Sequence, residues 1–253
     1  MKGLPARTGL AWLKAGFALF RQQPGILTMI IFANLLFSML MSRLPQLGAI
    51  LAFAALPCFS MAIQQACRLI DEGQRVGPDV LMTGFRKDTL WPLYRLGLIY
   101  LGAVMLMKLA VTPWINAAAL EHASKMVEAK QQPELDAGTM LAFTALSLMV
   151  MLTSLLLSFA PALTVWKRMS TFKAIFYSVF AVLGSKRALL MMLVGWFGIY
   201  WLLLLVLALF LGGTQIFLVV VVWSVLIATL ILQCAIYAAY KQILGAPEDV
   251  PPA

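Results

Sequence analysis

The chain has few charged residues: they are 11% of its 253 residues, whereas apolar residues are 62%. Water-soluble domains carry about 25% charged residues, so a soluble fold of this length would leave much apolar surface in water. The apolar residues form continuous stretches of about 20 residues, and not the alternating ten-residue segments of a membrane β-barrel. The composition therefore predicts an all-α polytopic membrane protein.

Histidine is almost absent, since His122 is the only one in the sequence. One imidazole is too few for a usual catalytic zinc site, and no HExxH motif is present. GxSxG, Walker-type and GxGxxG motifs are also missing, which leaves acyl transfer and nucleotide hydrolysis without an identifiable site. The cysteines, Cys58, Cys67 and Cys234, lie in apolar segments without CxxC spacing, and we interpret them as packing residues. We predict no catalytic residue, no metal and no cofactor, and a non-enzymatic function.

Acidic residues are scarce as well, and none falls at the centre of a predicted span. The ten are Asp71, Glu72, Asp79, Asp88, Glu121, Glu128, Glu134, Asp136, Glu248 and Asp249. Ion-coupled carriers commonly place a carboxylate within the membrane, where it changes charge or binds the cation. The sequence thus disfavours a carboxylate-driven pump, and a site built from cations and amides would prefer an anion.

What the sequence does contain is six apolar stretches long enough to cross a bilayer. The predicted spans are residues 25–41, 47–67, 93–113, 139–163, 188–211 and 216–240. They make up a single integral membrane domain, 1–245. The residues after it, 246–253, are predicted to be a disordered tail. The polar segment between the third and fourth spans is predicted to contain a short solvated helix on the outer side.

The net charge of +9 comes from cations that flank the spans. Most of them fall on one predicted side, and only Arg43, Lys125 and Lys130 fall on the other. This positive-inside bias places both termini in the cytoplasm. Because the cations do not lie on an aromatic-interleaved polar face, we predict contacts with phospholipid and no nucleic-acid partner.

An amphipathic segment precedes the first, third and fifth spans, at about 8–22, 78–90 and 170–186. We interpret all three as interfacial helices in the cytoplasmic headgroup plane. The first has an apolar stripe of Leu10, Leu13, Phe17 and Phe20, and the third has one of Phe172, Ile175, Phe176, Val179, Phe180 and Leu183. The middle segment is weaker and rests on Leu81, Phe85 and two cations. The predicted interfacial lipid contacts are Arg7, Lys14, Arg21, Arg86, Lys87 and Lys173.

These units suggest a threefold internal repeat in which each interfacial helix is followed by a two-span hairpin. "AIQQACR" from Ala62 resembles "AIYAAYK" from Ala235, and "ALTVWKR" from Ala162 is a looser copy. All three units start on the same side, so the hairpins would be parallel repeats about an axis along the membrane normal. Alternatively, any hairpin that enters from the cytoplasm carries such a pattern.

Several of these segments carry a family resemblance. They are "GLAWLKAGFALFRQQPGIL", the re-entry "LPQLGAIL", and "CRLIDEGQRVGPDVLMTGFRK" after the second span. In them the chain resembles uncharacterised six-span bacterial inner-membrane proteins, the YciC-like proteins. It also resembles the membrane regions fused to glycerophosphodiester phosphodiesterases. The likeness lies mainly in residues 9–87. It implies an architecture and a bacterial inner membrane, and it implies no active-site residue.

Five polar residues within the spans are candidate anion, lipid or cavity residues: Lys108, Asn34, Arg95, Gln233 and Gln64. Arg95 and Lys108 lie near the two ends of the third span, so both side chains can instead reach the membrane surfaces. Lys108 is the deeper of the two. The amides can instead join helices to one another. A binding role for these residues is better supported if Asn34 and Lys108 line the same cavity.

The sequence leaves three functions open. We favour a non-enzymatic protein of the cell envelope whose partners are the bilayer and anionic lipid headgroups. The first alternative is a carrier or channel for a small anionic or neutral solute, and the second is a scaffold subunit of an envelope complex. The sequence does not identify any protein partner.

Overall fold

The computed structural model describes residues 4–44, 47–115 and 137–246. The part of the chain that it describes is helical and contains no strand. Within these ranges, six helical segments are long and apolar enough to cross a membrane. They are α2 (Pro24–Met41), α3 (Leu47–Asp71), α4 (Lys87–Val111), continued by the 3₁₀ helix η2 (Thr112–Trp114), α6 (Ala137–Leu156) with α7 (Ala160–Trp166), α9 (Lys186–Leu211) and α10 (Gln215–Leu244). Each predicted span coincides with one of these segments, which confirms the all-α polytopic fold.

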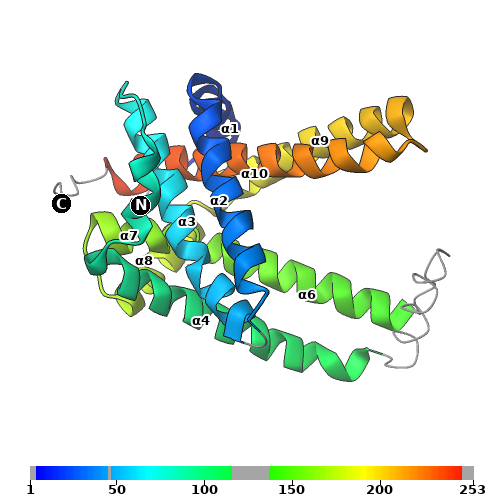
Figure 1. The fold of residues 1–253 in the computed structure, drawn as a ribbon, viewed down its shortest axis with the longest axis horizontal. Coiled ribbons are helices and arrows are strands. Elements are labelled where there is room, and N and C mark those ends of the chain that lie inside the picture. The colour runs from blue at the N-terminus through cyan, green and yellow to red at the C-terminus, as the bar shows by residue number, and fades with distance from the viewer. Residues whose placement is uncertain (1–3, 45–46, 116–136, 247–253) are drawn as a thin grey trace.

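Consecutive long helices pack side by side as α2 with α3, α4 with α6, and α9 with α10. In Figure 1 the α4/α6 pair and the α9/α10 pair diverge from each other toward the right of the view. We call the divergent ends the tips, and the opposite ends, from which α2, α4 and α9 start, the base. Leucines along the tips are exposed, as expected of helices surrounded by lipid, for example Leu209 with 76% of its surface accessible.

The fourth span is interrupted between α6 and α7. Proline cannot continue a regular helix because it lacks an N–H and its ring clashes with the preceding turn. Pro161 instead occupies the first turn of α7, where its missing N–H does no harm. The backbone of residues 157–159 forms a turn between the two helices. The proline therefore coincides with a break between two helices.

The first amphipathic segment is helix α1 (Arg7–Gln22), which packs against α9 and α10. Gly9 lies against the backbone of Ala188 in α9, and Gly16 lies against that of Ala235 in α10. Because of this close approach, the face of α1 that carries the two glycines packs against the protein. The residues of the predicted apolar stripe are then partly buried and partly exposed. Leu13 is buried within the protein, whereas Leu10 and Phe17 stay exposed. The predicted stripe is thus only partly available to lipid.

The second amphipathic segment differs most from the prediction. In place of one helix over 78–90, the chain forms the 3₁₀ helix η1 (Pro78–Gly84) and then starts α4 at Lys87. Arg86 is extended, with φ −66° and ψ 146°, so no helix runs through it. Gly84 lies against the backbone of Cys58 in α3, a contact that leaves no room for a side chain. This packing holds η1 as a short turn on α3.

The third amphipathic segment is helix α8 (Thr171–Gly184). Most of its buried positions are occupied by small or hydroxyl side chains, such as Ala174, Ser178 and Ala181. Its large side chains point outward, with Phe172 78% exposed and Phe176 58% exposed. A helix that buries small residues and exposes aromatic ones suits a membrane interface and would be unfavourable in water.

The amphipathic elements share one packing rule. Element η1 packs on α3, which precedes it, and α8 packs on α4, α6 and α7, which precede it. Helix α1 has no preceding pair and packs on α9 and α10, the last pair. Each element also contacts a second pair: η1 contacts α4, α8 contacts α9, and α1 contacts α2 and α3. The elements therefore bridge neighbouring helix pairs, and α1 closes the ring. The threefold repeat itself stays a prediction.

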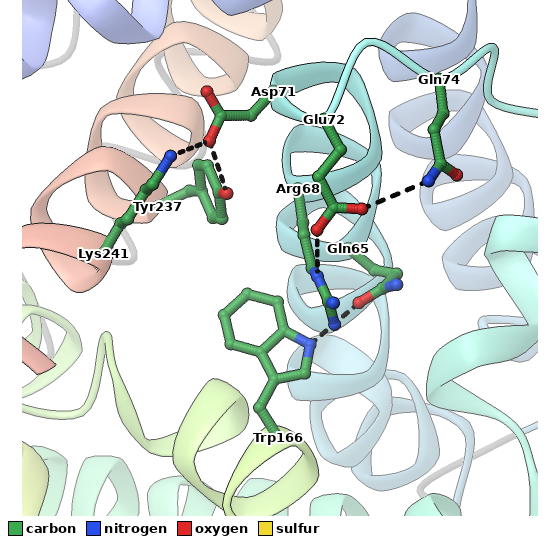
Figure 2. A network of polar contacts seen from close by, with 8 residues as sticks. All are labelled: Gln65, Arg68, Asp71, Glu72, Gln74, Trp166, Tyr237 and Lys241. Carbon is green, nitrogen blue, oxygen red and sulfur yellow. Dashed lines mark hydrogen bonds and ion pairs between the residues drawn. The ribbon is translucent and has the colours of Figure 1, made fainter. Parts of the chain in front are cut away.

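Polar contacts at the base join the second helix of each pair (Figure 2). The indole N–H of Trp166 in α7 donates to Gln65 of α3 at 2.9 Å. The carboxylate of Asp71, the last residue of α3, accepts from Tyr237 at 3.0 Å and from Lys241 at 2.6 Å, both in α10. Helices α3, α7 and α10 are thereby held together where the aqueous boundary is expected. His122, the predicted outer helix and the predicted tail after Ala246 lie outside the described residues.

Candidate functional site

A cavity of about 520 Å³ lies between the three helix pairs. Helices α2, α3, α4, α6, α7, α9 and α10 all contribute to its wall. Most lining side chains are apolar, and several at its rim, including Leu35 and Leu56, are exposed. The cavity is therefore open on part of its boundary, toward the surface that faces lipid.

The polar residues of the cavity wall are all neutral. They are Asn34, Ser60, Tyr100, Ser154, Ser158, Thr229 and Gln233. No charged residue of the described chain lines the cavity. In a water-poor site an unpaired ion is strongly disfavoured, so this wall fits a neutral group or a hydrocarbon chain better than an ion.

These polar groups lie at different depths. Asn34 is close in sequence to Phe32, whose ring packs 5.3 Å from that of Trp223 in α10. Gln233 is ten residues beyond Trp223, or about 15 Å of helix nearer the base. The hydroxyl groups of Tyr100 and Ser154 hydrogen-bond at 2.7 Å and join α4 to α6. Asn34 and Gln233 therefore share the cavity without forming one compact cluster.

At the basal end of the cavity, the break between α6 and α7 frees backbone groups. The hydroxyl of Ser178, in α8, donates to the carbonyl of Leu156 at 2.7 Å and accepts the N–H of Phe159 at 3.3 Å. The amide of Gln64, in α3, donates to the carbonyl of Ser158 at 3.4 Å. Buried backbone groups need such partners, so side chains from α3 and α8 stabilise the break.

Two buried side-chain atoms beside this break have no hydrogen-bond partner: Gln64 Oε1 and Ser158 Oγ. Gln64 is completely buried. Close by, the Ser60 hydroxyl donates to Gln233 Oε1 at 3.5 Å. The basal end of the cavity is therefore a polar region in which two atoms remain unsatisfied, and buried unsatisfied atoms are uncommon in folded proteins.

The amide candidates from the sequence lie in or beside the cavity wall, and the cations do not. Asn34 and Gln233 line it, and Gln64 lies next to its basal end. Lys108 is exposed and is absent from the wall. The guanidinium of Arg95 lies over the ring of Trp91, 5.0 Å from its centroid. That contact suits a cation near the membrane surface. Asn34 and Lys108 thus do not share the cavity.

The predicted interfacial cations lie on the elements that surround the base. Arg7, Lys14 and Arg21 on α1, and Lys87 and Lys173 on α4 and α8, are exposed. Arg86 is half-buried. The carboxylate of Glu72 pairs instead with Arg68, which is nearly buried, at 2.8 Å. Asp71 and Glu72 are therefore both occupied by residues of the bundle, and the exposed cations of α1 keep their charge available to other groups.

Sequence reasoning missed the serines. Ser60, Ser154, Ser158 and Ser178 were not candidates, because a serine within an apolar helix usually bonds its own backbone four residues back. Ser147 does so, with the carbonyl of Phe143 at 2.8 Å. The one sequence signal near Ser158 is Pro161, because a proline is typical of a bend or break in a helix. No group of acids, histidines and cysteines that suits a metal ion occurs within the described ranges.

Comparison with known proteins supports the membrane assignment. The chain is 27% identical over 265 aligned positions to a probable inner membrane protein of Burkholderia thailandensis, and the alignment covers 98% of this chain and 94% of that protein. No protein-family model and no solved structure matches the chain. This relative and the six apolar helices together indicate an integral inner-membrane protein.

Proposed function

We propose that the protein is a non-enzymatic inner-membrane protein that binds membrane lipid. The observation that carries this proposal is the cavity of about 520 Å³ between the helix pairs, with its mainly apolar, uncharged wall and its partly open rim. Its size lies in the range of sites for small molecules and lipid chains. A hydrocarbon chain that enters from the bilayer would meet apolar side chains along most of this wall.

The base supplies the second part of the proposal. The exposed cations of α1 and α8 flank it, and α8 also presents Phe172, Phe176 and Phe180. Apolar side chains at the level of the headgroups, next to cations, favour binding to the anionic surface of a cytoplasmic leaflet. Lys108, exposed near the other end of α4, is proposed to contact headgroups of the opposite leaflet.

A carrier for a small neutral solute is the second candidate. It is favoured by the series of neutral polar groups that extends from Asn34 past Tyr100 to Gln233 along one cavity. The absence of charge from the described wall does not favour an anionic solute. Movement of a neutral solute into proteoliposomes would support this candidate over simple lipid binding.

The proposed cytoplasmic position of the base gives a first prediction. Ser42 lies just beyond α2 at a tip, and Gln22 is exposed at the base. In whole cells, a membrane-impermeant thiol reagent should label Ser42→Cys and should label Gln22→Cys only after the inner membrane is permeabilised. The native cysteines are buried and should react little. The reverse pattern would place the base on the outer side and remove the basis for the cytoplasmic lipid contacts.

A second prediction concerns the cations of α1. Each exposed cation near an anionic surface contributes about 1 kcal/mol of attraction. Replacing Arg7, Lys14 and Arg21 together by Gln should therefore lower the retention of phosphatidylglycerol relative to phosphatidylethanolamine about tenfold or more. The measurement is native mass spectrometry of the protein released from mixed micelles at low salt.

Arg43→Gln is the matched control, because it removes one exposed cation from a tip rather than from the base. It should change the retained lipid much less than the triple variant, even per charge. An unchanged phosphatidylglycerol ratio in the triple variant would contradict the proposed contacts at α1.

A further inference from the structure

Next to the basal end of the cavity lies a hydrogen-bond acceptor that no protein group satisfies. Gln64 directs one side-chain atom at the carbonyl of Ser158, 3.4 Å away. A carbonyl can only accept a hydrogen bond, so the Gln64 atom that faces it must be the nitrogen. The oxygen, Gln64 Oε1, is then fixed as an acceptor, and it is buried without a partner.

Ser158 connects this acceptor to the cavity. Its carbonyl accepts from the Gln64 amide, the residue lines the cavity wall, and its hydroxyl has no partner. A hydroxyl both donates and accepts. The pair therefore offers an acceptor at Gln64, beside the wall, and an acceptor-donor at Ser158, on the wall of a cavity that is otherwise mainly apolar.

The chemistry of this pair selects the ligand. A phosphate or carboxylate accepts hydrogen bonds, so it would place a negative charge next to an oxygen that needs a donor. An ammonium donates, but the described wall holds no acid to balance its charge. A neutral hydroxyl group donates to Gln64 Oε1 and accepts from Ser158 Oγ, which satisfies both atoms.

We propose that the cavity binds a neutral lipid with a free hydroxyl group, the hydroxyl at Gln64 and Ser158 and the chain along the apolar wall. This inference rests on the proposed lipid-binding function and narrows it. The anionic headgroups at the exposed cations of the base and the neutral ligand in the cavity are then different lipids in different places.

Two probes that differ only at the headgroup test this proposal. Purified full-length protein in detergent is incubated with equal amounts of radiolabelled dioleoylglycerol and dioleoyl phosphatidic acid, and the bound lipid is measured after gel filtration. The chains are identical, and a hydroxyl replaces the phosphate. We expect the wild type to retain dioleoylglycerol over phosphatidic acid by about tenfold, the scale of one buried hydrogen bond.

Gln64→Leu keeps the approximate volume and removes the acceptor, so this preference should disappear. Asn34→Leu is the matched control, since it removes another amide from the same cavity, at a position nearer the tips. It should keep the preference. Should Gln64→Leu fail to elute as a monodisperse protein, Ser158→Ala takes its place and is expected to reduce the preference about threefold, because one of the two contacts remains.

The outcomes separate this inference from the proposed function. Equal retention of the two probes by the wild type, or an undiminished preference in Gln64→Leu, overturns the hydroxyl site. Retention of neither probe also overturns it and leaves the two atoms to a buried water. If phosphatidylglycerol is still retained through α1 in any of these cases, lipid binding at the base stands and the cavity ligand alone is wrong.

Discussion

Gly16→Ala should detach α1 from the bundle or shift it markedly. A methyl group at this position would lie 2.6 Å from the backbone nitrogen of Ala235 and 2.8 Å from the carbonyl oxygen of Ile231. Both atoms belong to the backbone of α10, which cannot rotate away as a side chain does. The substitution therefore forces the two helices apart, and overpacking of this kind lowers the free energy of unfolding by about 1–3 kcal/mol.

The consequence extends beyond one contact because α1 closes the ring of helix pairs. Trp12 and Leu19 are buried side chains of α1, and the Trp12 indole donates to Gln242 of α10 at 2.6 Å. When α1 moves outward, these side chains lose their packing and the last helix pair loses its cover. The expected readout is a lower midpoint of thermal unfolding in detergent, by roughly 2–4 °C for each kcal/mol.

Gly102→Ala is the matched control. Gly102 is also a glycine within a long helix, α4, but nothing lies within 4 Å of the position that its methyl group would take. This variant should be at least as stable as the wild type, because alanine favours the helix over glycine. Equal midpoints for the Gly16 and Gly102 variants would show that α1 does not depend on close contact with α10.

The second large effect is expected for Ser178→Ala. The Ser178 hydroxyl is completely buried and serves two backbone groups of the break between α6 and α7. Alanine fits the space, so packing changes little. The carbonyl of Leu156 and the N–H of Phe159 would both lose their partner, and each unsatisfied buried group costs about 1–3 kcal/mol.

We expect a lower midpoint of thermal unfolding and, in native-state hydrogen exchange, faster exchange of the amide of Phe159. Ser147→Ala, on the exposed side of α6, is the control, since that hydroxyl bonds only within its own helix. It should leave both measurements nearly unchanged. If the Ser178 and Ser147 variants behave alike, side chains of α8 do not support the break.

The candidate residues differ in how far the sequence alone could predict them. Asn34 and Gln233 stand out because an amide is rare in an apolar span, and both line the cavity. Lys108 stood out for the same reason and lies outside the wall, because a long cationic side chain on an exposed helix face can reach the membrane surface. Ser158 and Ser178 carried no signal, since their roles depend on partners from other helices.

The amphipathic segments likewise differ in how far the sequence alone could predict them. For α8, the aromatic stripe predicted from the sequence is the exposed face of the helix, because the buried face carries mostly small or hydroxyl side chains. For α1, only part of the predicted stripe is exposed, since Leu13 is buried. Glycines at positions 9 and 16 have no weight in a hydrophobic pattern, yet they determine which face meets α9 and α10. A pattern of apolar side chains cannot register a contact between backbones.

The sequence by itself determined that the protein is a bundle of six apolar helices. The reason is local: about 20 consecutive apolar residues must satisfy their backbone groups within one helix when no water is present. The tertiary structure decided which pairs diverge, how α1 closes the ring, and that Gln64 and Ser158 meet at the end of a cavity. Those features depend on contacts between residues far apart in the chain, such as Gln64 with Ser158, and no local pattern encodes the distance between them.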